Sequence, residues 1–154
     1  MQKKISIIVS FFFSCLIYGQ NGKVIKVKDG DTIVVLDENN KQHTIRIADV
    51  DCPEKGQPFG TKAKEFTSKE VFGKHVEIDK KNIDKYGRVV GYVIYDEKNL
   101  SFELLKEGYA WHYKYYSKDI EMAKLEEFAK ENKKGLWVGK KPINPYKWRK
   151  GIRK

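Results

Sequence analysis

Apolar and polar residues alternate along the chain from residue 22, in "GKVIKVKDGDTIVVLDENNKQHTIRIADV", a stretch that is also rich in Val and Ile. A two-residue period with β-branched residues is typical of half-buried strands, and the polar breaks "KDGD" and "DENNKQ" are typical of turns. The pattern therefore predicts three strands in a meander, over residues 22–28, 31–37 and 41–48.

After the third predicted strand, the spacing of the apolar residues changes from that of a strand to that of a helix. "GTKAKEFTSKEVFGK" indicates a helix, with Gly73 as its stop signal. The residues of this stretch that lie near helical spacing are Ala63, Phe66, Glu70 and Val71. Beyond this helix, "HVEIDKKN" and "GRVVGYVIYDE" indicate two more strands around the turn "NIDKYG".

Two further helices are predicted in the second half of the chain. "NLSFELLKEGYA" indicates a short helix that ends at Gly108. "SKDIEMAKLEEFAKENKKG" indicates a longer helix, with Ser117 as a candidate cap and Gly135 as its end signal. The apolar positions of the longer helix are Ile120, Ala123, Leu125 and Phe128. In the tail "LWVGKKPINPYKWRKGIRK", the prolines limit regular structure.

The order of these elements is three strands, one helix, two strands and two helices. That order fits an α+β fold, a five-stranded OB-type β-barrel with three α-helices. Because no long linker, repeat or low-complexity block interrupts the chain, we expect one domain over residues 20–138 and a basic C-terminal tail over residues 139–154.

The first residues have the layout of a secretory signal. A positive start, "MQKK", precedes the uncharged apolar run "ISIIVSFFFSCLIYG". Since a spanning helix needs roughly 20 apolar residues, this run is too short for one. We therefore predict a signal peptide over residues 1–19, a secreted or periplasmic protein, and no transmembrane span in the mature chain. A second interpretation is that "FFSC" is a weak lipobox, with Cys15 as the lipid-bearing residue.

Composition narrows the range of partners. The chain has 31 Lys and Arg against 21 Asp and Glu, a net charge of +10. Such an excess indicates a polyanionic partner such as nucleic acid, or an anionic membrane, although solubility alone can also explain it. Nine Tyr, eight Phe and three Trp suit base stacking as well as an ordinary core. Without Cys15, Cys52 has no partner for an internal disulfide, and the three histidines show no metal-ligand spacing.

Three short stretches combine acids and arginines: "DGDT" at residues 29–32, "RIADVDCPE" at 46–54 and "DKYGR" at 84–88. Taken singly, each has a structural explanation, as a hairpin turn, a polar strand end stopped by proline, or a turn with solvated charges. Together they supply carboxylate oxygens of the kind that Ca²⁺ accepts, and arginine forks that match phosphate oxygens. A metal, fixed cations and a carboxylate that activates water form a suitable set for phosphodiester hydrolysis.

In this order and at similar spacing, "DGDT", "R-x4-D-x-P-E" and "DKYGR" resemble the motifs of the staphylococcal-nuclease-like thermonucleases. The resemblance covers roughly residues 22–137. It implies an OB barrel with helices, and a Ca²⁺-dependent endonuclease that hydrolyses DNA and RNA and leaves 3′-phosphate ends. We expect a monomer with nucleic acid as substrate and no stable protein partner.

The resemblance also implies a role for individual residues. Calcium would be held by Asp31, by Asp51 and by the backbone carbonyl of Cys52, where the best-known member has Thr. Arg46 and Arg88 would be the catalytic arginines that bind the phosphate.

Glu54 would be the general base, in contact with the metal at most through water. Lys85 and Tyr86 would contact the substrate's phosphate. Tyr113 would pack against the nucleotide, with Tyr115 and Tyr116 as alternatives.

Some features depart from the family pattern. The loop "KGQPFGTKAKEF" is shorter than in the best-known member, which bears on substrate access. Asp49 fits no family role, and we interpret it as a solvated acid at a strand end rather than as a metal neighbour. We assign Asp29 and Asp84 to turn and local pairing roles.

Two other functions compete with the nuclease. One is a non-catalytic nucleic-acid-binding OB module, and the other is a basic envelope-associated protein that binds anionic lipid through its tail. Both leave the acids and arginines unexplained, because a binding module does not need the whole set of Asp31, Arg46, Asp51, Glu54 and Arg88.

Overall fold

The structure, a computed structural model, describes residues 21–139 and 141–153. The predicted signal peptide, residues 1–19 with Cys15, lies outside the described residues. Within the described ranges, no helix has the length and apolar character that crossing a membrane requires.

Five strands close into a barrel, as the sequence predicts. β1 (Gly22–Asp29), β2 (Thr32–Leu36) and β3 (Gln42–Ile47) form the antiparallel meander, and β5 (His75–Ile83) joins β1 to β6 (Val89–Tyr95). β6 then pairs in parallel with β3, which closes the sheet. The short β7 (Lys98–Asn99) pairs in antiparallel fashion with the last residues of β6. This confirms the α+β fold with a five-stranded OB-type barrel.

Alternation of buried and exposed positions explains the barrel core. Along β6, every second residue from Val89 to Tyr95 points inward and is buried. Ile33, Ile45 and Ile78 fill the same core from the other strands. Because side chains alternate with a period of two, a slip of one residue in any strand would expose its apolar set.

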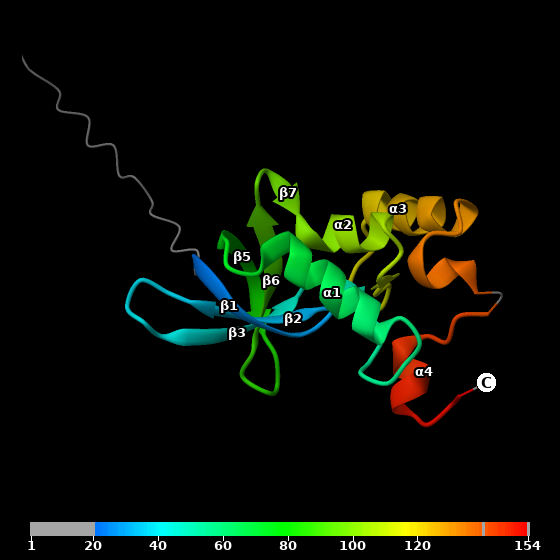
Figure 1. Ribbon diagram of the computed structural model, residues 1–154, viewed down its shortest axis with the longest axis horizontal. Coiled ribbons are helices and arrows are strands. Elements are labelled where there is room, and N and C mark those ends of the chain that lie inside the picture. Colours follow the sequence, from blue (N-terminus) through cyan, green and yellow to red (C-terminus); the bar gives the residue numbers. More distant parts are fainter. Residues whose placement is uncertain (1–20, 140, 154) are drawn as a thin grey trace, which may run out of the picture.

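The predicted helices are present. They are α1 (Gly60–Val71), α2 (Leu100–Lys106) and α3 (Ile120–Glu131). α1 packs against β1, and α2 packs against α3. Figure 1 shows α1 lying across the strands, with α2 and α3 gathered at one end of the molecule.

The cap and the buried face of α3 differ from the prediction. Asp119 caps the helix, because its side chain accepts a hydrogen bond from the Met122 N–H, whereas Ser117 lies farther from the helix start. Two of the apolar positions that indicated the helix are exposed, Ile120 at 72% and Phe128 at 42%. The buried residues are instead Met122, Glu126 and Ala129.

The cause of this difference is a buried carboxylate. Glu126 lies on the inner face of α3, where it accepts a hydrogen bond from the His112 N–H at 3.0 Å. Lys114 and Lys130 pair with the same carboxylate. A buried charge is tolerated when it is paired and hydrogen-bonded in this way. Because an acidic residue lies on the inner face of α3, the pattern of apolar residues alone does not indicate which face of the helix is buried.

Several short elements were not predicted. β4 (Val50–Asp51) pairs with β8 (Trp111–His112) in a small second sheet that positions Asp51. After the 3₁₀ helix η1 (Gly135–Val138), the tail forms α4 (Pro145–Arg149). The prediction that prolines limit regular structure was wrong for α4, because proline is well suited to the first turn of a helix.

Candidate active site

The turn between β1 and β2 holds the first acid of the site. The Asp31 N–H donates to Asp29 Oδ1 at 3.1 Å, and the Thr67 hydroxyl of α1 donates to the Gly30 carbonyl at 2.6 Å. A Cβ atom on Gly30 would lie 2.9 Å from Cys52 Sγ and 2.8 Å from Ala63 Cβ. The glycine of "DGDT" is therefore needed because the turn packs directly against the side chains of Cys52 in the second motif and Ala63 in α1.

Asp31 is tied to the second motif by the backbone. The Cys52 N–H donates to Asp31 Oδ2 at 2.6 Å, and the Ile47 N–H donates to the Asp31 carbonyl at 2.8 Å. Asp31 and Asp51 are both buried. The structure thus joins "DGDT" and "RIADVDCPE" in one cluster.

Arg46 lies between the two aspartates. Its Nη2 atom is 3.2 Å from Asp31 Oδ2 and 3.2 Å from Asp51 Oδ1, and its Nη1 donates to the Ile47 carbonyl at 2.8 Å. Burial lowers the pKa of Arg46, but the charges of Asp31 and Asp51 outweigh this effect and raise it. The guanidinium is therefore a permanent positive charge held at a fixed place among the acids.

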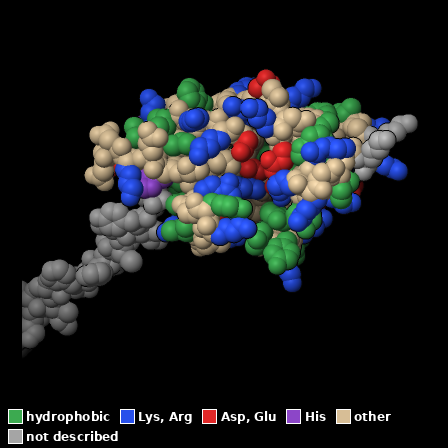
Figure 2. All heavy atoms as spheres, turned by 90° about the horizontal axis from the view of Figure 1, so that it is seen from below, with side chains coloured by type: hydrophobic (Ala, Val, Ile, Leu, Met, Phe, Trp, Pro, Cys, Tyr) green, Lys and Arg blue, Asp and Glu red, His purple; other side chains and the backbone are tan. Residues whose placement is uncertain are grey.

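Negative charge is concentrated in this cluster. Burial and the charge of Asp31 raise the pKa of Asp29 to about 6. Burial also raises the pKa of Asp51, with Asp31 adding to the effect and the arginines opposing it. Figure 2 shows acidic side chains gathered on one face of the molecule and surrounded by Lys and Arg. Such a cluster of acids favours the binding of a further cation.

Glu54 stands at the edge of the cluster. Its backbone N–H donates to Gln57 Oε1 at 2.9 Å, which fixes the loop after Pro53. The side chain is 37% exposed, and Oε1 accepts a hydrogen bond from Arg149 Nη1 at 2.5 Å. A partly exposed carboxylate at this place has access to water from the solvent.

Arg149 is a site residue that the sequence analysis missed. From α4, its Nη1 reaches Asp51 Oδ1 at 3.1 Å and its Nη2 reaches Asp51 Oδ2 at 3.0 Å. The only signal in the sequence was the basic character of the tail, which does not indicate which arginine turns toward the acids.

The structure does not bring Arg88 to the acids. Its Nε donates to Asp84 Oδ2 at 2.7 Å, and Asp84 Oδ1 accepts from the backbone N–H groups of Tyr86 and Arg88. In the part of the chain that the structure describes, no ion pair joins Arg88 to Asp31, Asp51 or Glu54. The role of Arg88 on the phosphate remains a prediction.

The turn at residues 84–88 lines an open groove of about 620 Å³. Lys28, Lys41, Tyr86 and Arg88 are among the residues around it. The Tyr86 ring is exposed, and Lys85 Nζ lies 5.1 Å from the ring centre. An exposed aromatic face between cations is the type of surface that binds nucleotides.

Tyr113, one of the three candidate tyrosines, is influenced by the charge of the acids. Burial raises the pKa of Tyr113, followed by the charge of Asp51. Tyr115 and Tyr116 are exposed, and the rings of Tyr113 and Tyr116 meet edge to face at 4.9 Å. The contact between Tyr113 and a nucleotide remains a prediction.

Asp49 is not the solvated acid that we expected. It is buried, and its Oδ2 accepts hydrogen bonds from the Tyr92 hydroxyl at 2.5 Å and from Lys81 Nζ at 2.7 Å. Its φ of 61° lies in the left-handed region, which is uncommon for a non-glycine residue. Its carbonyl accepts from the Tyr113 N–H at 2.9 Å, so Asp49 positions the chain at Tyr113.

Few side chains of the site are placed to coordinate a calcium ion. Asp31 and Asp51 are hard oxygen donors that already share one cation, and therefore fit Ca²⁺. Over residues 21–139 and 141–153, no three His, Cys, Asp or Glu side chains are grouped to hold a metal. Water and backbone oxygens would thus complete the shell. The role of the Cys52 carbonyl as a calcium ligand remains a prediction. The thiol of the same residue is buried, and burial raises its pKa well above the ordinary value.

Comparison with known proteins is consistent with this site. A family model described as staphylococcal nuclease homologue matches residues 44–139. A protein of Haemophilus influenzae named uncharacterized endonuclease is 40% identical over 128 residues, 83% of this chain and 72% of its own. A micrococcal nuclease of Shigella flexneri is 36% identical over 140 residues, 84% of this chain and 80% of its own. An uncharacterized endonuclease of Escherichia coli is 34% identical over 151 residues, 97% of this chain and 98% of its own.

The family model covers more than half of the chain, and the match includes Arg46, Asp51, Glu54 and Arg88. The family resemblance is thereby confirmed, and the matched range includes two of the three motifs, "RIADVDCPE" and "DKYGR". This chain belongs to the family of staphylococcal nuclease homologues.

Proposed function

We propose that this protein is a Ca²⁺-dependent endonuclease that hydrolyses phosphodiester bonds of DNA and RNA and leaves 3′-phosphate ends. The observation on which this mainly rests is the position of the half-buried Arg46, which pairs with both Asp31 and Asp51. The acidic side chains on that face of the molecule are bordered by basic ones (Figure 2). Relatives named endonuclease and micrococcal nuclease support a hydrolytic endonuclease with nucleic acid as substrate.

In this proposal, different residues of the chain bind the ion, bind the phosphate and activate the attacking water. Asp31, Asp51 and the Cys52 carbonyl would hold the ion, which would supply positive charge to the phosphoryl oxygens. Arg46 binds the phosphate and stabilises the charge that develops on it in the transition state. Glu54, which is partly exposed, orients a water molecule and removes its proton.

Arg88 would act as the second phosphate-binding arginine. To do so it must leave Asp84, a partner four residues away near the surface. The pair is half-buried and close to the surface, where ion pairs contribute about 1 kcal/mol or less, so a phosphate can replace Asp84 at little cost. Lys85, Tyr86 and Tyr113 would hold the nucleotides on either side.

We also propose that residues 1–19 are a signal peptide, and that the mature protein is a monomer that is secreted or periplasmic. The sequence pattern "MQKK" followed by an uncharged apolar run supports this. Attachment of lipid at Cys15 is the alternative. Mass spectrometry of the protein recovered from the envelope and from the medium distinguishes the two forms.

A digest tests the proposed activity. Residues 20–154 would be incubated with 5′-labelled single-stranded DNA in Ca²⁺ and in excess chelator, and the new ends identified. We expect cleavage only with Ca²⁺, and 3′-phosphate products. Cleavage in excess chelator would overturn the metal assignment, and tight, salt-sensitive binding without cleavage would indicate the non-catalytic binding module.

A further inference from the structure

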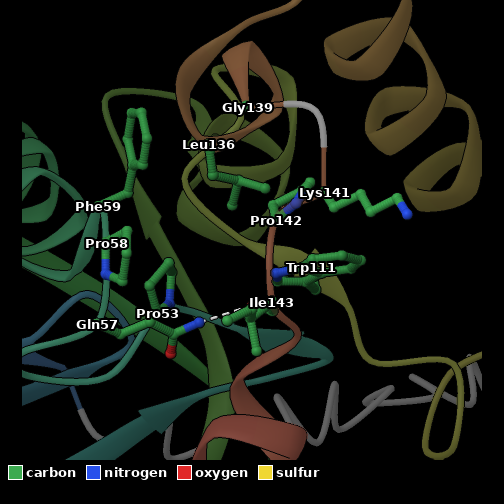
Figure 3. Close-up of a pocket in the computed structure, with 10 residues that line it drawn as sticks. All are labelled: Pro53, Gln57, Pro58, Phe59, Trp111, Leu136, Gly139, Lys141, Pro142 and Ile143. Atoms are coloured by element: carbon green, nitrogen blue, oxygen red, sulfur yellow. Dashed lines mark hydrogen bonds between the residues drawn. The ribbon is translucent and has the colours of Figure 1, made fainter. Parts of the chain in front are cut away.

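A strap formed by residues 142–149 runs from the loop after Glu54 to the acids of the site. Its first anchor is the side chain of Gln57, which is buried. Gln57 Nε2 donates to the Ile143 carbonyl at 2.7 Å, while Gln57 Oε1 accepts from the Glu54 N–H at 2.9 Å. One amide therefore connects the strap to the backbone of the proposed general base, as Figure 3 shows for the Gln57–Ile143 bond.

Apolar contacts reinforce this anchor. Pro142 and Ile143 line a cavity of about 210 Å³ together with Trp111, and Pro53 and Pro58 line it from the other side (Figure 3). Removing this apolar surface from water favours the docked position of the strap. The strap thus begins at a defined place on the domain.

The helix α4 then directs the chain toward the site. The Asn144 side chain accepts a hydrogen bond from the Tyr146 N–H at 2.9 Å, and Pro145 occupies the first turn. Both features favour the start of a helix at this residue. Arg149 lies at the end of α4, where its side chain points to Asp51 and Glu54.

Arg149 and Arg46 together occupy most of the Asp51 carboxylate that calcium would use, and Arg149 makes two of the three contacts. Its two terminal nitrogens lie 3.1 and 3.0 Å from Asp51 Oδ1 and Oδ2, and Arg46 Nη2 lies 3.2 Å from the same Oδ1. An ionised carboxylate offers about four lone-pair positions, so three are taken by guanidinium N–H groups. A bidentate arginine–carboxylate pair is among the stronger charge-assisted hydrogen bonds.

We propose that this strap is autoinhibitory: Arg149 is a built-in cation that competes with Ca²⁺ for Asp51 and restrains Glu54. The proposal rests on the proposed calcium site at Asp31 and Asp51. Two positive groups on one carboxylate repel each other, so Ca²⁺ coordinates Asp51 fully only when Arg149 withdraws.

The strap is built so that Arg149 can withdraw. Its side chain is 39% exposed, whereas the anchor at Gln57 and Ile143 lies at the other end of the strap. A guanidinium fork that leaves a carboxylate matches the oxygens of a phosphate equally well. A nucleic acid backbone beside the site therefore offers Arg149 a second partner, and favours the open form.

Calcium affinity without nucleic acid tests the proposal. We would titrate Ca²⁺ into wild-type protein, Arg149→Gln and Arg149→Lys by calorimetry. Arg149→Gln should bind Ca²⁺ about tenfold more tightly than wild type, in the range typical of such coupling. Arg149→Lys keeps the charge but loses the fork, and should give a smaller gain.

Arg153→Gln is the matched control. Arg153 belongs to the same tail, but its guanidinium stacks on the Trp148 ring at 3.7 Å and donates to the Trp148 carbonyl. Removing this charge should leave the calcium affinity unchanged. In wild type, Ca²⁺ should also speed hydrogen exchange in residues 145–151, because withdrawal of Arg149 loosens α4.

Three outcomes overturn the proposal in distinguishable ways. Equal affinity in wild type and Arg149→Gln, with binding lost in Asp51→Asn, would exclude the strap while the calcium site stands. Absence of Ca²⁺ binding in every variant would exclude the calcium site together with the strap. Equal gains in calcium affinity for Arg149→Gln and Arg153→Gln would show that only the net charge of the tail matters, and not the contact of Arg149 with Asp51.

Discussion

Arg46 stands opposite Thr32 in the β2–β3 ladder, and this register brings Arg46 Nη2 within 3.2 Å of Asp31 Oδ2. A slip of one residue between these strands would turn Arg46 to the other face of the sheet. The barrel therefore does more than support the site. Its strand register decides which arginine reaches the buried acids.

The first prediction concerns stability. Arg46→Ala leaves Asp31 and Asp51 buried without their shared cation, although Arg149 still contacts Asp51. Loss of one partner from a buried ion pair is strongly destabilising, and we expect a loss of about 3 kcal/mol in the free energy of unfolding. Urea denaturation with excess chelator measures this.

Arg88→Ala is the control for that measurement. Its ion pair with Asp84 lies nearer the surface, so the loss of stability should be about 1 kcal/mol or less. Equal losses in the two variants would contradict the buried role of Arg46.

The second prediction concerns Glu54 as the general base. Glu54→Gln keeps an oxygen that can accept the hydrogen bond from Arg149, but it cannot accept a proton. We expect hydrolysis of labelled single-stranded DNA to fall about 10²- to 10⁴-fold. Since the side chain is partly exposed, stability should change by about 0.5 kcal/mol or less. Near-normal turnover in a folded variant would exclude the base role.

The third prediction tests whether Arg88 acts on the substrate although it pairs with Asp84 in the structure. Arg88→Ala should reduce cleavage about 10²- to 10³-fold, because it removes a fixed donor to the phosphoryl oxygens. Arg88→Lys keeps the charge but not the planar fork, and should recover little of the rate. If either variant cleaves DNA like wild type, the turn at residues 84–88 only binds substrate or only stabilises the barrel.

Much of the fold and part of the site could be predicted from the sequence. The strands alternate with a clear period, and the acids of "RIADVDCPE" are contiguous with Arg46, so local pattern was sufficient to find them. The order of the elements predicted an OB-type barrel. The parallel pairing of β3 with β6, which closes the barrel, is a finding of the structure.

The rest depends on long-range contacts that no local pattern records. Arg149 reaches Asp51 only because Gln57 anchors the strap at Ile143. Asp49 is buried only because Tyr92 and Lys81 arrive from other strands. In each case, a polar residue that looks solvated in the sequence finds its partner through the tertiary fold.

The fourth prediction concerns the glycine of "DGDT". In Gly30→Ala, the new Cβ would lie 2.7 Å from Cys52 Cβ and 2.8 Å from Ala63 Cβ, so the turn must shift. Overpacking of this kind costs about 1–3 kcal/mol, and moving the turn should also weaken the hydrogen bond between Asp31 and the Cys52 N–H. The matched control is Gly139→Ala, where the nearest atom is 3.6 Å away. Thermal unfolding of both variants should show a loss for Gly30→Ala alone.

The fifth prediction is a dependence of stability on pH. Burial and the charge of Asp31 raise the pKa of Asp29 from its ordinary value of 3.8 to about 6. Between these values the folded protein holds a proton that the unfolded chain has released, so this group makes stability fall as pH rises from about 4 to about 6. Asp29→Asn cannot ionise and keeps an acceptor for the Asp31 N–H, and should therefore be more stable than wild type at pH 7 by about 1–3 kcal/mol.

Asp37→Asn serves as a control of opposite sign. The hydrogen bonds from His43 and from the Lys41 N–H lower the pKa of Asp37, so its ionised form stabilises the folded protein above the ordinary pKa. Urea midpoints in excess chelator, compared between pH 7 and about pH 3.5, should show Asp29→Asn gaining stability relative to wild type only at the higher pH. Asp37→Asn should instead lose stability there. If both variants followed the pH profile of wild type, the acids of the β1–β2 turn would not repel each other as the structure indicates.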